Sequence, residues 1–173
     1  MVEIGLSYYY FIITQSQNQN SNSIFEGAYA SYYGETKLVD QTIGMQLREE
    51  IVNLNSTHAR IMYYMKIESN SLEKIYEQQD MNWVSLNDPS YAIEDMIFLN
   101  KQPDYVFIPN LGTKYCMVYE YKYKAGTGLD GTMTVYADER SGWAYQFDFS
   151  FNISDLNFSM QLPLEDTNIP ALR

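Results

Sequence analysis

The sequence predicts a mainly β, α+β fold, in which a strongly curved antiparallel sheet or half-barrel of about 8–11 strands carries one or two helices on its concave face. The chain has 17 Tyr, 8 Phe and 2 Trp among 173 residues, and aromatic side chains favour strands. From 143 to 151 every odd position is aromatic, which places the rings on one face of a strand. Short polar turns join neighbouring strand-like runs, and such turns are typical of antiparallel pairing.

The domain organisation follows from a change in composition near residue 23. Residues 1–23 form an N-terminal apolar segment followed by an Asn/Gln/Ser-rich linker, and 24–173 form a single antiparallel β domain. No Lys or Arg precedes the apolar stretch, and Glu3 lies where an export signal carries positive charge. The segment is therefore either an ordered helix or strand, or a remnant of an export signal.

The first part of the domain predicts one strand and one helix. The strand covers 24–33 and ends at Gly34. A helix is expected from Thr36, because apolar residues recur at a spacing of three or four positions. These are Val39, Ile43, Leu47, Ile51 and Leu54. His58 follows in a polar turn and has no second histidine to form a zinc site.

The middle of the chain predicts a three-stranded meander and a second helix. The strands are 59–68, 72–77 and 81–86, with polar turns at 69–71 and 78–80. Pro89 suits the first turn of a helix over 90–99, which presents Ile93, Met96 and Ile97 on one side. Residues 100–103 end this helix, and 105–108 return as a strand.

The C-terminal part predicts a second meander with strands at 114–123, 132–136 and 143–151. Gly142 in the turn 138–142 is expected to have positive φ. The glycines at 126, 128 and 131 match G-x-G-x-x-G by letter, but a strand follows them, so they predict a hairpin loop and no dinucleotide site. The single cysteine, Cys116, is expected to be a buried small hydrophobe.

Charge and motifs exclude several classes of function. The formal net charge of -11 disfavours nucleic-acid binding. No catalytic motif, metal-ligand cluster or cofactor motif is present in the sequence, so we expect no enzyme, no metal and no cofactor. The apolar stretches are too short for a transmembrane segment. Adjacent acidic pairs such as Glu49–Glu50 are typical of a solvated surface.

The order of these elements resembles the periplasmic lipoprotein-carrier (LolA-like) superfamily. The resemblance lies in Arg60 opening a strand, the run Trp83-Val-Ser-Leu-Asn-Asp88 before a short helix, and the late hairpin Tyr136-Ala-Asp-Glu-Arg-Ser-Gly-Trp143. It implies a half-barrel closed by a helical lid, with a hydrophobic concavity that accepts acyl chains. It also implies a periplasmic or secreted protein. The Gln-Gln-Asp turn at 78–80 and the many tyrosines depart from the family pattern.

These observations predict a non-catalytic binding module for lipid or another apolar ligand. The alternative is a structural or protein-interaction component whose aromatic face is only core, and whose sheet edge or surface contacts a partner chain. Under the first hypothesis the ligand-binding residues are aromatic or aliphatic side chains of the concave face and the helix: Trp83, Ile93, Met96, Ile97, Trp143, Tyr145, Phe147 and Phe149.

Overall fold

The computed structural model describes residues 23–173 except 39–40, 71–73, 87–95, 125–129 and 154–155. Its elements are nine strands and one short 3-10 turn. All nine strands belong to one antiparallel sheet with the order β4-β3-β2-β1-β9-β8-β7-β6-β5. The bounds are β1 (Tyr29–Leu38), β2 (Gln41–Leu54), β3 (His58–Ser69), β4 (Lys74–Ser85), β5 (Met96–Ile108), β6 (Gly112–Tyr123), β7 (Asp130–Ala137), β8 (Ala144–Ile153), β9 (Leu156–Thr167) and η1 (Pro170–Leu172).

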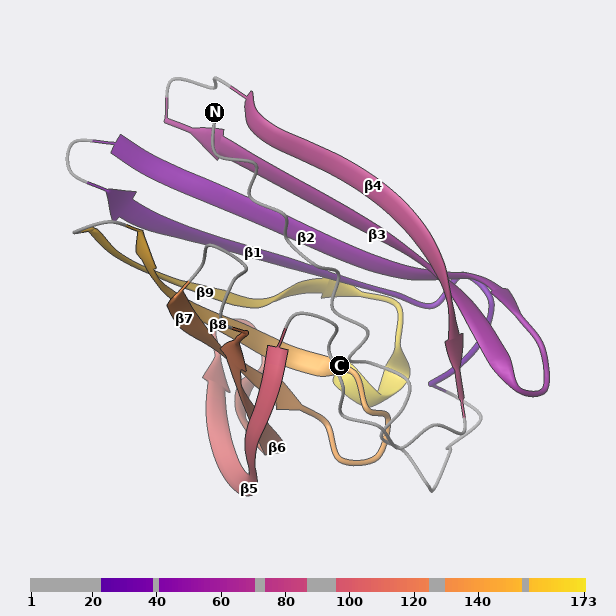
Figure 1. Cartoon of the computed structure of the whole chain (residues 1–173). Coiled ribbons are helices and arrows are strands. Elements are labelled where there is room, and N and C mark those ends of the chain that lie inside the picture. Colours follow the sequence, from indigo (N-terminus) through magenta and orange to yellow (C-terminus); the bar gives the residue numbers. More distant parts are fainter. Residues whose placement is uncertain (1–22, 39–40, 71–73, 87–95, 125–129, 154–155) are drawn as a thin grey trace.

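The sheet curls into a half-barrel, with β1–β4 side by side as one layer and β5–β9 passing beneath them (Figure 1). The junction between the two parts is the pairing of β1 with β9. It extends only over Ala30–Tyr32, and a bulge interrupts its register between Ser31 and Tyr32. Bulges bend a sheet and increase its twist, so the two halves meet at a steep angle here.

Gly34 allows the two backbones to approach closely just beyond this junction. A Cβ atom at this position would overlap the backbone oxygen of Gln161 on β9. The absence of a side chain therefore lets β1 lie close against β9, where any other residue would push the strands apart. The sequence predicts a strand that ends at Gly34, whereas β1 continues through it to Leu38.

The predicted helix from Thr36 to Leu54 is wrong, because the described residues there form the end of β1 and all of β2. Ile43, Leu47 and Ile51 are four positions apart, and four is an even number, so they share one face of a strand as well as one face of a helix. The intervening Met45 and Glu49 are also buried, which gives β2 a period of two. Pairing with β1 and β3 along nearly the whole strand stabilises the extended form.

The second predicted helix is also wrong where the structure describes it. Residues 96–99 begin the edge strand β5, and residues 87–95 lie outside the described part of the chain. Pro103, expected to follow the helix, lies within β5, where an edge strand can accept a residue that lacks an N–H. The α+β prediction with helices on the concave face is thus corrected to a sheet whose only helical element, within the described residues, is η1.

The meander from β3 to β4 has two long strands where the sequence predicts three short ones. The expected turn at 78–80 is continuous strand, and its residues pair with Met65, Tyr64 and Tyr63. Polar residues are common on edge strands, because one face and one edge remain in water. Their polarity therefore indicates an edge position and no turn.

The hairpin between β7 and β8 confirms the predicted turn. Gly142 has φ of 74°, and the N–H of Asp138 donates to the oxygen of Trp143 at 2.8 Å. The Asp138 carboxylate accepts the N–H groups of Arg140 and Ser141, which fixes the turn. No helix among the described residues has the length and apolar character needed to cross a membrane.

Candidate functional site

The aromatic row of β8 lies inside the curled sheet. The rings of Phe147 and Phe149 stack at a centroid distance of 6.3 Å, and those of Phe149 and Phe151 at 6.0 Å. Tyr32 from β1 meets Phe147 edge-on at 4.8 Å. Phe147 and Phe149 are buried. The rings therefore join the β1 side of the half-barrel to the β8 side as core.

Trp143 and Tyr145 are also buried, but each occupies a different setting from the phenylalanines. The indole Nε1–H of Trp143 donates to the backbone oxygen of Ser23 at 2.9 Å, which ties the turn before β8 to the start of the described chain. Tyr145 is the extra residue of a bulge, because Gln146 pairs with Tyr136 and Ala144 with Ala137. Its hydroxyl donates to Asp138 at 3.2 Å. Burial, followed by the charge of Asp138, raises the pKa of Tyr145.

Of the remaining predicted ligand-binding residues, Trp83 and Ile97 are exposed and lie apart from the buried aromatic row. Met96 is buried at the start of β5, while its neighbour Ile97 is 49% exposed. Trp83 is 51% exposed and pairs with the exposed Arg60, on the face of β4 opposite the buried Val84. Ile93 lies outside the described residues. Their role in ligand binding stays a prediction.

A buried carboxyl group in the core was not found from the sequence. Glu49 on β2 lies between Ala30 of β1 and Tyr63 of β3 in the register, and both of its oxygens are without a hydrogen-bond partner. Burial raises its pKa well above the usual value, so the neutral form is favoured in the fold. The prediction that the pair Glu49–Glu50 is solvated is therefore wrong for Glu49. The period-two pattern of β2 could have indicated its inward position.

The exposed apolar side chains collect on the two edges of the sheet. Among the described residues, the eight large hydrophobic side chains that are exposed lie on the edge strands β4 and β5, or on β6 beside β5. Six of these belong to the β5–β6 side: Ile97, Phe98, Leu99, Tyr105, Phe107 and Tyr115. An apolar concentration of this kind distinguishes the β5–β6 edge from the rest of the described surface.

Three of these side chains form a surface that we call the hairpin aromatic surface: Tyr105, Phe107 and Tyr115. They are 66%, 67% and 47% exposed. Tyr105 and Tyr115 are register partners, and their rings meet at 5.4 Å. The register also places them on the same side of the sheet as the buried Tyr119 and Tyr121. The apolar inner face of the half-barrel thus continues to the edge, where it becomes exposed.

The opposite side of the same hairpin is buried, which holds the exposed rings in place. Val106, Ile108 and Cys116 belong to the core, and the Cys116 Sγ–H donates to the oxygen of Asp104 at 3.4 Å. Burial raises the pKa of Cys116 to about 11, with a smaller contribution from Asp104. The prediction of a buried cysteine is confirmed. The residues 105–108 are all aromatic or aliphatic, and a strand directs alternate side chains to opposite faces. This pattern could have indicated the hairpin aromatic surface, because only one of the two faces is buried.

His58 and the acidic residues do not form a metal site in the described part of the chain. The Thr57 hydroxyl lies 2.9 Å from Nδ1 of His58, and the N–H of His58 donates to the side-chain oxygen of Asn55. These contacts place the histidine in a local turn. No group of three or more potential ligands is found among the described residues.

The fold and these surfaces define the chain as an open, curled half-barrel of antiparallel strands with a buried aromatic cluster. No protein-family model and no curated protein matches the sequence. A solved structure from Bacteroides fragilis, described as an inferred exported protein with a YmcC-like fold, is similar with a TM-score of 0.47 and 11% identity. The match covers 83% of this chain and 96% of that one.

Proposed function

We propose that the protein is a non-catalytic interaction protein that assembles with a second copy of its chain through the hairpin aromatic surface. The observation that carries the proposal is the exposure of Tyr105, Phe107 and Tyr115 on a hairpin whose other face is buried. Aromatic side chains are enriched at protein interfaces, because they bury a large area with few rotatable bonds. The aromatic row of β8 then acts as core.

The charge of the hairpin supports a second copy as the partner. The chain carries a net charge of -11, which opposes association between two copies. Strands β5 and β6 contain three basic residues, Lys101, Lys114 and Lys122, and two acidic ones, Asp104 and Glu120. Electrostatic repulsion between two acidic chains is therefore low when the β5–β6 edges of both copies face each other.

The edge strand favours contact through side chains over the addition of another strand. Pro103 lacks an N–H, and a bulge lies between Phe98 and Asn100. Both features hinder the continuous pairing that edge-to-edge association requires. The rings of the hairpin aromatic surface then supply the apolar area for contact between two copies.

The test is sedimentation equilibrium of the full chain at micromolar to sub-millimolar concentration. We expect reversible dimers for the natural sequence, and at least about 10-fold weaker association for Tyr105→Ser combined with Phe107→Ser. The control is Met81→Ser combined with Trp83→Ser, which removes exposed apolar side chains from the opposite edge and should leave association unchanged. A chain that stays monomeric, or equal weakening by both double variants, contradicts the proposal.

Binding of lipid or another apolar ligand stays a prediction, and two further measurements distinguish it from self-association. Native mass spectrometry of the purified protein and flotation with phosphatidylcholine vesicles measure it directly. A co-purified lipid in a monomeric protein overturns self-association and favours the carrier hypothesis. Location in the periplasm or outside the cell also stays a prediction, to be measured by cell fractionation.

A further inference from the structure

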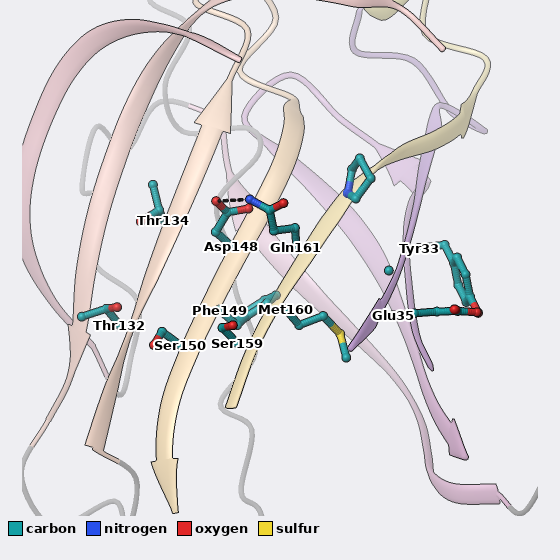
Figure 2. A pocket seen from close by; sticks show the side chains of 12 residues that line it. Tyr33, Glu35, Thr132, Thr134, Asp148, Phe149, Ser150, Ser159, Met160 and Gln161 are labelled. Atoms are coloured by element: carbon teal, nitrogen blue, oxygen red, sulfur yellow. Dashed lines mark hydrogen bonds between the residues drawn. The ribbon is translucent and has the colours of Figure 1, made fainter. Parts of the chain in front are cut away.

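A polar hollow lies on the face of the sheet opposite the aromatic row. Its volume is about 670 Å³, within the range of small-molecule sites. Figure 2 shows Asp148 and Gln161 on adjacent strands, with Tyr33 and Glu35 on a separate strand across from them. The lining comes from β1, β7, β8 and β9: Tyr33, Gly34, Glu35, Thr132, Thr134, Asp148, Phe149, Ser150, Ser159, Met160, Gln161 and Pro163.

The hollow results from the divergence of β1 and β9. Their ladder ends at Tyr32, and β1 last lies against the backbone of β9 at Gly34. The outward-facing residues of β1 then form one wall, and those of β7–β9 form the other. The same two features that curl the half-barrel therefore open a concave site on its other face.

The carboxylate of Asp148 is held at the centre of the second wall. The Gln146 amide donates to Oδ1 at 2.6 Å, and the Gln161 amide donates to Oδ2 at 3.2 Å. The Tyr136 hydroxyl also donates to Oδ2, at 3.3 Å. Across the hollow, the Tyr33 hydroxyl donates to Glu35 at 2.5 Å, and this bond raises the pKa of Tyr33 to about 12. Both carboxylates therefore accept hydrogen bonds from neutral side-chain donors.

The charge of the lining excludes one class of ligand. It contains two carboxylates and neither lysine nor arginine among its residues. Glu68 and Glu165 add negative potential at Tyr33. Phosphates, sulfates and carboxylates are repelled by such a surface.

The hydrogen-bonding groups favour a neutral polyhydroxyl ligand over a cation. The carboxylate oxygens of Asp148 and Glu35 already accept hydrogen bonds from protein side chains. These bonds stabilise part of the negative charge without a bound cation. The other polar groups are the hydroxyls of Thr132, Thr134, Ser150 and Ser159, which both donate and accept, and the amide of Gln161. Pro163 adds an apolar surface, on which the C–H face of a sugar can pack.

We propose that this hollow binds a carbohydrate, through the hydroxyl groups of β7–β9 and the apolar surface of Pro163. The volume of about 670 Å³ lies within the usual range of ligand sites and leaves room for a short oligosaccharide. The site is separate from the hairpin aromatic surface. Loss of self-association therefore does not remove it.

The experiment is an NMR titration of the isotope-labelled full chain with cellotriose, maltotriose and triacetylchitotriose, each to millimolar concentration. At least one sugar is expected to shift the backbone amides of Thr134, Ser150 and Gln161, with the shifts confined to β1 and β7–β9. Gln161→Ala and Thr134→Ala remove lining groups and should weaken this binding at least about 5-fold, the loss expected for one hydrogen bond.

Gln79→Ala is the matched control, because it removes an exposed amide from β4, outside the hollow. It should leave the affinity unchanged, and the amide spectrum of each variant reports whether it is folded. Spermidine tests the cationic alternative. The absence of shifts with all three sugars, shifts with spermidine alone, or sugar shifts unchanged in both lining variants overturns the proposal.

Discussion

The two faces of β7–β9 differ in what they leave open. On one face Phe147 and Phe149 are buried and stacked. On the other, Asp148 and Ser150 of the same strand line a hollow of about 670 Å³. The aromatic row therefore stabilises the fold, while the accessible concavity lies on the opposite face of the same strands.

Phe147→Ala should lower the free energy of unfolding by about 3–5 kcal/mol, because it removes a buried ring and leaves a cavity. Ser150→Ala, three positions along the same strand on the other face, should change it by less than about 0.5 kcal/mol. Urea denaturation followed by fluorescence measures both. Similar losses for the two variants would contradict the assignment of the faces.

Glu49→Leu should raise the free energy of unfolding near pH 8 by about 1–4 kcal/mol, because it replaces a buried carboxyl with an apolar side chain. The pKa of Glu49 is raised in the fold above its usual 4.5. Its contribution to stability is therefore greatest at pH below 4.5, and it falls as pH rises from 4.5 toward the folded pKa, by up to about 1.4 kcal/mol per pH unit.

The measurement for Glu49 is the free energy of unfolding from urea curves across this pH window. Glu49→Leu should remove the downward slope. Glu50→Gln is the control, because Glu50 pairs with Arg48 at 2.9 Å and is not fully buried. A slope that survives in Glu49→Leu shows that another group controls it.

Gly34→Ala should lower the free energy of unfolding by about 1–3 kcal/mol, because its Cβ would overlap the backbone of Gln161. Gly44→Ala should cost less, since the atom it meets is the Tyr33 hydroxyl, 3.0 Å away on a side chain that can move. Thermal unfolding compares the two. If Gly44→Ala were the more damaging variant, the contact of Gly34 with β9 would not be the tighter approach.

The Cys116 thiol should react slowly with a thiol reagent in the folded protein at pH 8. With a pKa of about 11, about one thiol in a thousand is ionised at that pH. Adding urea to unfold the chain should accelerate the reaction by more than about 100-fold. Absorbance of the released chromophore follows the rate, and equal rates with and without urea would contradict the burial of this side of the hairpin.

The sequence predicted the local features of the second meander better than its tertiary setting. Gly142 and the turn around Asp138 depend on a few neighbouring residues, and so they could be read directly. The spacing of Ile43, Leu47 and Ile51 is compatible with both helix and strand, so the local pattern could not decide β2. The proposed surfaces were not found, because the exposure of Tyr105 and Phe107 depends on where the neighbouring strands end.

The sequence alone was enough to predict a β-rich chain with antiparallel hairpins, an aromatic strand at 143–151 and an acidic chain that is expected to repel nucleic acid. These follow from side-chain alternation, turn chemistry and net charge, which are local or additive properties. The tertiary structure was needed to show that β1 pairs with β9, more than a hundred positions away, and that Gly34 brings their backbones close together. That long-range pairing sets the curl of the sheet, so it decides which rings are buried, which are exposed and where the polar face is hollow.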